Sequence, residues 1–469
     1  MIRQSYKILF SFIFLFILIS GIAAQQVTVS GSASGAEGKT LKFVTWADMI
    51  TFTEELVAQT TIDSLGNFSV SFELPSTSYI ALAIDLHRAG LYMQPGMTYQ
   101  LKIAQINYKD NLEVNPFILS EDLDIKLVYP GENGLNFRIN AYNDKYNQFL
   151  LDHFNALYHE RKKSYLDTFQ LKINNIFSGI ELSYFQNYML YKTAGLEQLA
   201  HTKSQYNLAS SYFIDQPILY KNVEYMQFFN NYFTKYLTVT SNILRKIDLI
   251  SVIKEPDPYP VLMKKLAADS VLKNENLREL VLLKGLFELF YSNPELQENI
   301  IRILATIRQE SPYENNRIVG ADMYDKVTKL SPGTKAPEFY LQGREKDGWK
   351  SLEDFKGKPV VLNFWTTFCE ECLAEMELQV PLFEKYKDEV EFVSICINRY
   401  WIQMNYFAEV KPEFAWWLLH YSDNTDLLID YEVKTYPLYL IIDKHGDTYQ
   451  FPAPPPSEGL ERVIESIIH

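Results

Sequence analysis

The sequence predicts a multidomain protein with an N-terminal β-sandwich, an α-helical middle domain and a C-terminal α/β domain. Short runs rich in Val, Thr, Phe and Ile, broken by turn residues, fill residues 25–130. Apolar residues then recur at helical spacing over residues 131–329, and short buried-strand patterns alternate with helical ones over residues 330–469. The chain has 469 residues, of which 47% are hydrophobic and 22% are charged, which is a globular composition.

Residues 1–24 have the order of a secretory signal peptide. Arg3 and Lys7 precede an almost wholly apolar run, Ile8–Ser20, and small residues follow it up to Ala24. An uncleaved membrane anchor is the alternative, but the run is shorter than the roughly 20 residues that span a bilayer. We therefore expect cleavage near Gln25 and a mature protein in the periplasm or cell envelope.

Residues 25–130 have the pattern of a β-sandwich, because many short strands are separated by frequent turn residues. Gly66-Asn67 lies between the runs Thr60–Ile62 and Phe68–Phe72, and both of its residues tolerate positive φ. This pattern predicts a tight hairpin between the two runs.

Residues 131–329 carry aromatic and aliphatic side chains at spacings of three and four, which predicts a helical domain. The aromatic stripes have two interpretations, a binding groove or a core packed with Phe and Tyr, and the core is favoured. The stripes are Tyr142, Tyr146, Phe149 and Leu150, and then Tyr225, Phe228, Phe229, Tyr232, Phe233 and Tyr236.

Residues 330–469 alternate between buried strands and helices, which predicts an α/β sheet covered on both faces. Continuous apolar runs mark the strands, and amphipathic segments mark the helices. The predicted strands are Val360–Phe364, Val390–Ile397 and Tyr439–Ile442, and the predicted helices are about Cys369–Tyr386 and Leu460–Ile468.

Charge and cysteine content narrow the function. The formal net charge of −14 repels phosphate backbones, so we expect no nucleic-acid partner. Two of the three cysteines, Cys369 and Cys372, form a C-x-x-C motif, which favours redox chemistry over a disulfide scaffold. A zinc site needs two further ligands at comparable spacing, and the sequence offers none, so we expect no metal and no cofactor.

The C-x-x-C motif falls where the first buried strand of the last domain gives way to a helix. Two thiols three residues apart on a first helical turn can close a disulfide with little backbone movement. The first of them faces the unpaired N–H groups of the helix, which stabilise a thiolate. Cys369 is therefore the predicted nucleophile and Cys372 the resolving thiol, whereas Cys396 falls in a strand and is expected to be buried and inert.

The surrounding residues resemble the TlpA/ResA-like branch of thioredoxin-fold oxidoreductases. The resemblance lies in Gly333–Phe339, in Ser351–Trp365 followed by C-x-x-C, and in Tyr431–Gly446. It implies a thioredoxin-like fold for residues 330–469, a cis Pro437 beside the motif, and a proton-shuttling Glu375. It also implies protein disulfides as substrates and a membrane thiol as electron donor. Residues 63–68 and 93–96 similarly resemble the small β-domain of bacterial envelope members.

Three positions differ from the family pattern and bear on partner preference and redox potential. Phe368 stands where the family has Trp, Glu371 where it has Pro, and Glu377 where the helix has a kinking Pro. Glu370 and Glu371 place negative charge next to Cys369, which disfavours its thiolate. Because strong oxidants of this fold stabilise the reduced thiolate, the acidic linker favours a reductase over an oxidase.

Two other functions compete with disulfide reduction. A peroxidase is the first, since Thr366 stands three residues before Cys369, but Leu362 occupies the position where such enzymes have Pro. The second is an envelope binding or structural protein that uses its thioredoxin-like domain as a docking module. The two preceding domains are together larger than the thioredoxin-like domain, so this alternative stays open.

Overall fold

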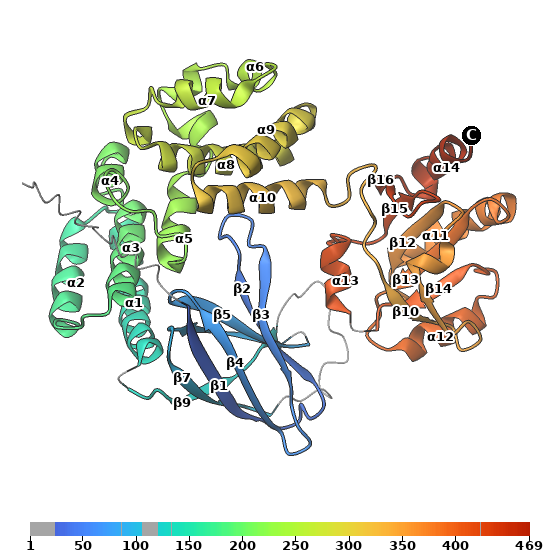
Figure 1. Ribbon diagram of the computed structural model, residues 1–469, viewed down its shortest axis with the longest axis horizontal. Helices are drawn as coiled ribbons and strands as arrows, with labels where there is room; N and C mark the ends of the chain where they lie inside the picture. The colour runs from blue at the N-terminus through green and yellow to red at the C-terminus, as the bar shows by residue number, and fades with distance from the viewer. Residues whose placement is uncertain (1–23, 86, 106–120, 133, 423) are drawn as a thin grey trace, which may run out of the picture.

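The computed structural model describes residues 24–85, 87–105, 121–132, 134–422 and 424–469, so the predicted signal peptide lies outside the described residues apart from Ala24. Strands come first, helices follow, and a mixed α/β region ends the chain (Figure 1). No helix within the described ranges is both long and apolar enough to cross a membrane.

The first region consists of two sheets whose inner faces share one core. In the first sheet β1 pairs with β4 and, in parallel, with β7, and β7 pairs with β9. The second sheet has the order β3-β2-β5-β6-β8. Val29, Phe43, Phe72 and Leu82, which come from both sheets, lie in the common core. The strands are β1 Gln25–Ala33, β2 Thr40–Trp46, β3 Glu54–Thr61, β4 Asn67–Leu74, β5 Ser78–Ile84, β6 His87–Met93, β7 Thr98–Ile103, β8 Glu121–Asp122 and β9 Ile125–Tyr129.

The hairpin predicted at Gly66-Asn67 is wrong, although the turn itself exists. Gly66 has a φ of +77°, and its N–H donates to the carbonyl of Asp63 at 3.0 Å. However, β3 pairs with β2, and β4 pairs with β1 in the other sheet. Ile62 and Phe68 on either side of the turn are both buried in the shared core. The turn therefore carries the chain across that core from one sheet to the other.

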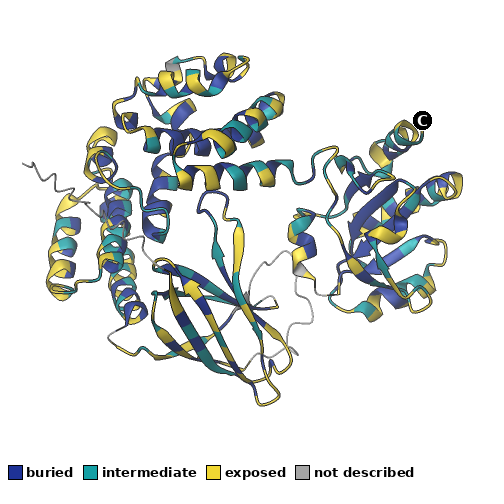
Figure 2. Ribbon diagram, in the orientation of Figure 1, coloured by how far each residue is buried: buried dark blue, intermediate teal, exposed yellow. Residues whose placement is uncertain are grey.

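The second region is helical, and its aromatic side chains form cores. Phe213, Phe228, Phe229 and Phe233 pack together in a large apolar cluster, which supports the core interpretation of the stripe Tyr225–Tyr236. The ribbons of the helical region alternate between buried and exposed residues (Figure 2). Short 3-10 or π turns lie between several of the described helices. The helices are α1 Leu135–Tyr158, α2 Lys163–Ile176, α3 Ser183–Leu199, α4 Gln205–Tyr212, α5 Val223–Tyr232, α6 Leu249–Ile253, α7 Pro258–Leu266, α8 Glu275–Ser292, α9 Gln297–Glu310 and α10 Glu314–Thr328; the turns are η1 Tyr236–Thr240, η2 Leu244–Lys246, η3 Ser270–Leu272 and η4 Pro294–Leu296.

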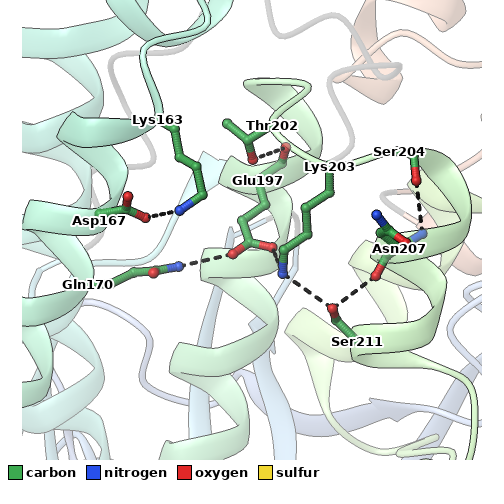
Figure 3. A network of polar contacts seen from close by, with 9 residues as sticks. All are labelled: Lys163, Asp167, Gln170, Glu197, Thr202, Lys203, Ser204, Asn207 and Ser211. Atoms are coloured by element: carbon green, nitrogen blue, oxygen red, sulfur yellow. Dashed lines mark hydrogen bonds and ion pairs between the residues drawn. The ribbon is translucent and has the colours of Figure 1, made fainter.

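A buried carboxylate joins three of the helical segments. Glu197 near the end of α3 accepts a hydrogen bond from Gln170 of α2 and pairs with Lys203 at 2.7 Å (Figure 3). Lys203 also donates to Ser211 of α4. A buried charge is tolerated only when it is paired and hydrogen-bonded, as this one is. The cluster is thus a structural link between α2, α3 and α4.

The tip of the β2–β3 hairpin is docked on the helical region (Figure 1). Lys221, Asn230 and Lys326 donate from the helical region to backbone carbonyls within residues 46–51, at 2.7–3.2 Å. These bonds pair carbonyl groups that a hairpin tip otherwise leaves to solvent.

The last region is built on a sheet with the order β11-β10-β14-β13-β12-β15-β16. β12, β13 and β14 are parallel, and β15 runs antiparallel to β12. Side chains of β12 alternate between two cores: Leu362 and Phe364 face one, and Val361 and Trp365 face the other, beside α11 (Glu370–Tyr386). A strand buried on both faces reads as a continuous apolar run, which explains the sequence pattern. The other elements are β10 Tyr340–Gly343, β11 Trp349–Ser351, η5 Leu352–Phe355, β12 Val360–Trp365, β13 Glu391–Cys396, α12 Trp401–Val410, β14 Trp417–His420, α13 Thr425–Asp430, β15 Leu438–Ile442, β16 Thr448–Ala453, η6 Pro456–Glu458 and α14 Leu460–Ile468.

Candidate active site

The two cysteines of the C-x-x-C motif lie at the junction of β12 and α11. Cys369 is the N-cap of α11 and forms a disulfide with Cys372, with 5.2 Å between their Cα atoms. The backbone N–H of Cys372 donates to Sγ of Cys369 at 3.0 Å. Cys369 is half-buried, whereas Cys372 has no exposed surface. Of the two cysteines, only Cys369 has exposed surface that a partner molecule can reach.

The helix N-terminus is the electrostatic element of this site. The first N–H groups of a helix have no partner within the helix, and they stabilise a negative charge at the N-cap. Sγ of Cys369 already occupies the position of a capping acceptor, so a thiolate formed there keeps a hydrogen-bond donor. The arrangement can therefore support nucleophilic attack by Cys369.

Pro437 lies at the same end of the sheet as the C-x-x-C motif. The peptide bond between Tyr436 and Pro437 is cis, as the sequence predicts. β15 begins directly after it, and Leu438 pairs with Phe364 near the end of β12. β12 continues into the loop that carries Cys369. The turn at Pro437 and this loop therefore lie at the same end of two adjacent strands.

Glu375 lies on α11, one turn beyond the motif. Within the described residues its carboxylate is hydrogen-bonded to Ser457 and not to either cysteine. Its carboxylate accepts from the backbone N–H of Ser457 at 2.9 Å and from the Ser457 hydroxyl. The Glu375 carboxylate also lies near Tyr439. Burial is the larger cause that raises the pKa of the Tyr439 hydroxyl, and the charge of Glu375 is the smaller one. The predicted proton shuttle is thus held against η6 in this structure.

The acidic linker of the motif and the aromatic residue before it are on the surface. Glu370 and Glu371 form the first turn of α11, and both are exposed. Phe368 exposes 65% of its surface directly before Cys369. A partner that approaches Cys369 therefore meets two carboxylates and an aromatic ring.

Cys396 is buried, as predicted, at the end of β13. Burial raises the pKa of its thiol to about 12, so the thiol stays protonated at neutral pH. Its Sγ donates to Oδ1 of Asn398 at 3.1 Å. In the described part of the chain, no three His, Cys, Asp or Glu side chains gather as a metal site.

Two residues that support the site have no signal in the sequence that identifies them. Ser457 donates to the Glu375 carboxylate, and Asn398 bonds to Thr367, two residues before Cys369. Both contacts join positions at least 31 residues apart, so neither spacing nor periodicity reveals them. The motif and the Pro437 turn, in contrast, are local features and were predictable.

The C-terminal part of the chain is similar to known proteins. Residues 331–464 match the Redoxin family. Over 152 residues the chain is 31% identical to the thiol-disulfide oxidoreductase ResA of Geobacillus kaustophilus, an alignment that covers 31% of this chain and 83% of the relative. ResA of Bacillus cereus is 32% identical over 147 residues, again with 31% and 83% covered. A crystal structure of a putative thiol-disulfide oxidoreductase from Bacteroides vulgatus aligns with 30% of this chain and 99% of its own, at 25% identity and a TM-score of 0.28.

Proposed function

The chain belongs to the ResA-like thiol–disulfide oxidoreductases, and we propose that it reduces protein disulfides outside the cytoplasm through Cys369 and Cys372. One observation carries the assignment of roles: the partly exposed Cys369 caps α11, and Cys372 behind it is fully buried. The accessible sulfur is the one that attacks, and the buried one is protected from solvent until it resolves the mixed disulfide.

The reaction has two exchange steps. The Cys369 thiolate attacks one sulfur of the substrate disulfide; a mixed disulfide forms, and the other substrate sulfur leaves as a thiolate. Cys372 then loses its proton and attacks Sγ of Cys369, which releases the second substrate thiolate. The substrate gains two electrons and the enzyme ends as the Cys369–Cys372 disulfide. A membrane thiol donor then restores the dithiol.

Glu375 and Pro437 have proposed roles in these steps. Glu375 accepts the proton of Cys372 during the second step, which requires its carboxylate to leave the Ser457 hydroxyl. The backbone before Pro437 pairs with an extended segment of the substrate. The pairing of Leu438 with Phe364, next to the loop that carries Cys369, supports this second role.

The direction of exchange follows from the exposed acidic linker. Glu370 and Glu371 disfavour a negative charge on Cys369 and so destabilise the reduced form relative to the disulfide. A dithiol that is destabilised in this way gives up its electrons more readily. The linker therefore supports the reducing direction.

The organisation of the chain completes the proposal. Residues 1–24 act as a signal peptide that directs the protein to the periplasm or cell envelope, on the sequence pattern alone. The domains are a β-sandwich over residues 25–130, a helical domain over 131–329 and a thioredoxin-like domain over 330–469. The two sheets with a common core support the β-sandwich.

Insulin reduction by dithiothreitol tests the function. The mature protein is expected to accelerate the precipitation of the reduced insulin B chain, and Cys369→Ser is expected to abolish the acceleration. If the folded wild-type protein gives no acceleration above dithiothreitol alone, the reductase assignment is wrong and the docking-module alternative is favoured.

A further inference from the structure

The loop before Cys369 is hydrogen-bonded to the side chain of Asn398, which follows the neighbouring strand β13. Asn398 follows β13, and its Oδ1 accepts the backbone N–H of Thr367 at 2.9 Å. Its Nδ2 donates to Oγ1 of the same threonine at 2.7 Å. Thr367 lies two residues before Cys369, so this double contact fixes the backbone that presents the nucleophile.

The Asn398 amide is fully used. Besides Thr367, its Oδ1 accepts from the Cys396 thiol at 3.1 Å, and its Nδ2 donates to Oε1 of Gln403 on α12 at 3.1 Å. Two acceptor and two donor positions are the whole capacity of an amide side chain. Since the Thr367 N–H can only donate, the amide oxygen must face it, which fixes the orientation of the group. Asn398 is only 2% exposed, so water cannot replace these partners.

The backbone of Asn398 is fixed from the opposite side. Its carbonyl oxygen lies 2.7 Å from Nε2 of His420, at the end of β14. Nδ1 of that imidazole accepts the backbone N–H of Ser422 at 3.0 Å, so Nε2 carries the proton and donates to Asn398. A rigid support of this kind is what holds a side chain in one rotamer at an active site.

We propose that Asn398 is a positioning residue for the nucleophile: by clamping Thr367 it keeps Sγ of Cys369 at the N-terminus of α11. This inference rests on the proposed function, since it assigns Cys369 the attacking role. It extends that function by naming a residue that acts through the loop and does not touch the reacting sulfurs.

The physical consequence concerns the thiolate. Without the Asn398 side chain the backbone N–H of Thr367 loses its acceptor, and the loop must shift to find another. Sγ of Cys369 then moves away from the Cys372 N–H that it accepts at 3.0 Å. A thiolate with a weaker donor is less stable, so the thiol becomes harder to ionise and slower to react at neutral pH.

The test is the pH dependence of alkylation of the reduced full-length protein by iodoacetamide, with the modified cysteine identified by mass spectrometry. In Asn398→Ala the midpoint for Cys369 is expected to rise by about one pH unit, so that alkylation well below the midpoint is about tenfold slower than in wild type. Alkylation needs no disulfide substrate. An incorrect role for Asn398 would therefore appear as an unchanged alkylation midpoint, whereas an incorrect reductase assignment would appear as a lack of insulin reduction.

Asn405→Ala is the matched control. Asn405 is also buried and also holds a neighbouring loop, through the backbone N–H of Glu345 at 3.1 Å, but it does not contact Thr367. It is expected to keep the wild-type midpoint even if the protein loses stability. An unchanged midpoint in Asn398→Ala, or an equal rise in Asn405→Ala, overturns the proposal.

Thr367→Val covers the case in which Asn398→Ala does not fold. This variant keeps the size of the side chain and the backbone N–H, and it removes only the Oγ1 acceptor of Asn398 Nδ2. The midpoint is expected to rise in the same direction by a smaller amount. A folded Thr367→Val protein with the wild-type midpoint contradicts the clamp.

Discussion

Replacing Asp322 with Asn should stabilise the protein at neutral pH and leave it little changed in acid. Asp322 is half-buried on α10 beside Asp48, which lies at the tip of the β2–β3 hairpin and accepts the N–H groups of Ile50 and Thr51. Burial, and then the charge of Asp48, raise the pKa of Asp322 to about 7. The folded protein therefore binds a proton here that the unfolded chain releases near its ordinary pKa of 3.8.

The magnitude follows from the linkage between protonation and folding. Between pH 4 and pH 7 the unfolded chain binds fewer protons at this position than the folded one, so stability falls as pH rises. At about 1.4 kcal/mol per pH unit, the gap between 3.8 and about 7 corresponds to at most about 4 kcal/mol. Because Asp322 is half-exposed, solvent screening reduces this to about 1–2 kcal/mol. The amide introduced by Asp322→Asn has no proton to lose, so the variant avoids that loss of stability.

Urea denaturation of wild type and Asp322→Asn at several pH values between 4 and 8 measures the effect. The difference in the free energy of unfolding is expected to be small at pH 4, to grow with pH, and to level off above pH 7. Glu314→Gln is the control on the same helix, because Glu314 is exposed and lies about two turns before Asp322. A difference that is independent of pH, or one that Glu314→Gln reproduces, refutes the reasoning.

Three further predictions concern the candidate site. Changing both Glu370 and Glu371 to Gln should raise the reduction potential of the Cys369–Cys372 pair by about 20 mV or less, because exposed charges are screened. The potential is measured by equilibration with glutathione, and a potential that is unchanged or lower removes the basis for the reducing direction. Cys396→Ser should leave insulin reduction unchanged, since the buried thiol only donates a hydrogen bond that a hydroxyl also donates; a loss equal to that of Cys369→Ser would reassign the nucleophile. Glu375→Gln should slow the decay of the mixed disulfide in stopped-flow measurements, whereas Ser457→Ala, which keeps the carboxylate, should not; equal rates in Glu375→Gln and wild type exclude the proton shuttle.

The fold was predictable where a local signal and the tertiary environment agree. Val360–Phe364 is apolar throughout because β12 is covered on both faces, and the helix after Cys369 follows from its capping position. β14 has no such signal: Trp417–His420 is short, and its strand character comes from pairing with β13 and β10. Tertiary pairing likewise overrides the turn at Gly66, which the sequence marks correctly as a turn but not as a hairpin.

The positions of the two paired cysteines were predictable from the sequence, and the residues that support their loop were not. The spacing of Cys369 and Cys372 correctly predicts that they are close enough to form a disulfide at the start of a helix, and their roles as nucleophile and resolving thiol stay predictions. Asn398 is a lone polar residue after a strand, and only the fold brings it to Thr367. The resemblance points to Glu375 as a site residue, but its hydrogen-bond partner Ser457 lies 82 residues away along the chain, which no local pattern indicates.

Trapping the covalent intermediate tests the central claim most directly. In Cys372→Ser the resolving thiol is absent, so Cys369 should remain bound to its substrates, and non-reducing electrophoresis of the cell envelope should show mixed disulfides that dithiothreitol releases. The double variant Cys369→Ser/Cys372→Ser should show none. The same adducts in the double variant, or no adduct in folded Cys372→Ser, would contradict disulfide exchange through Cys369.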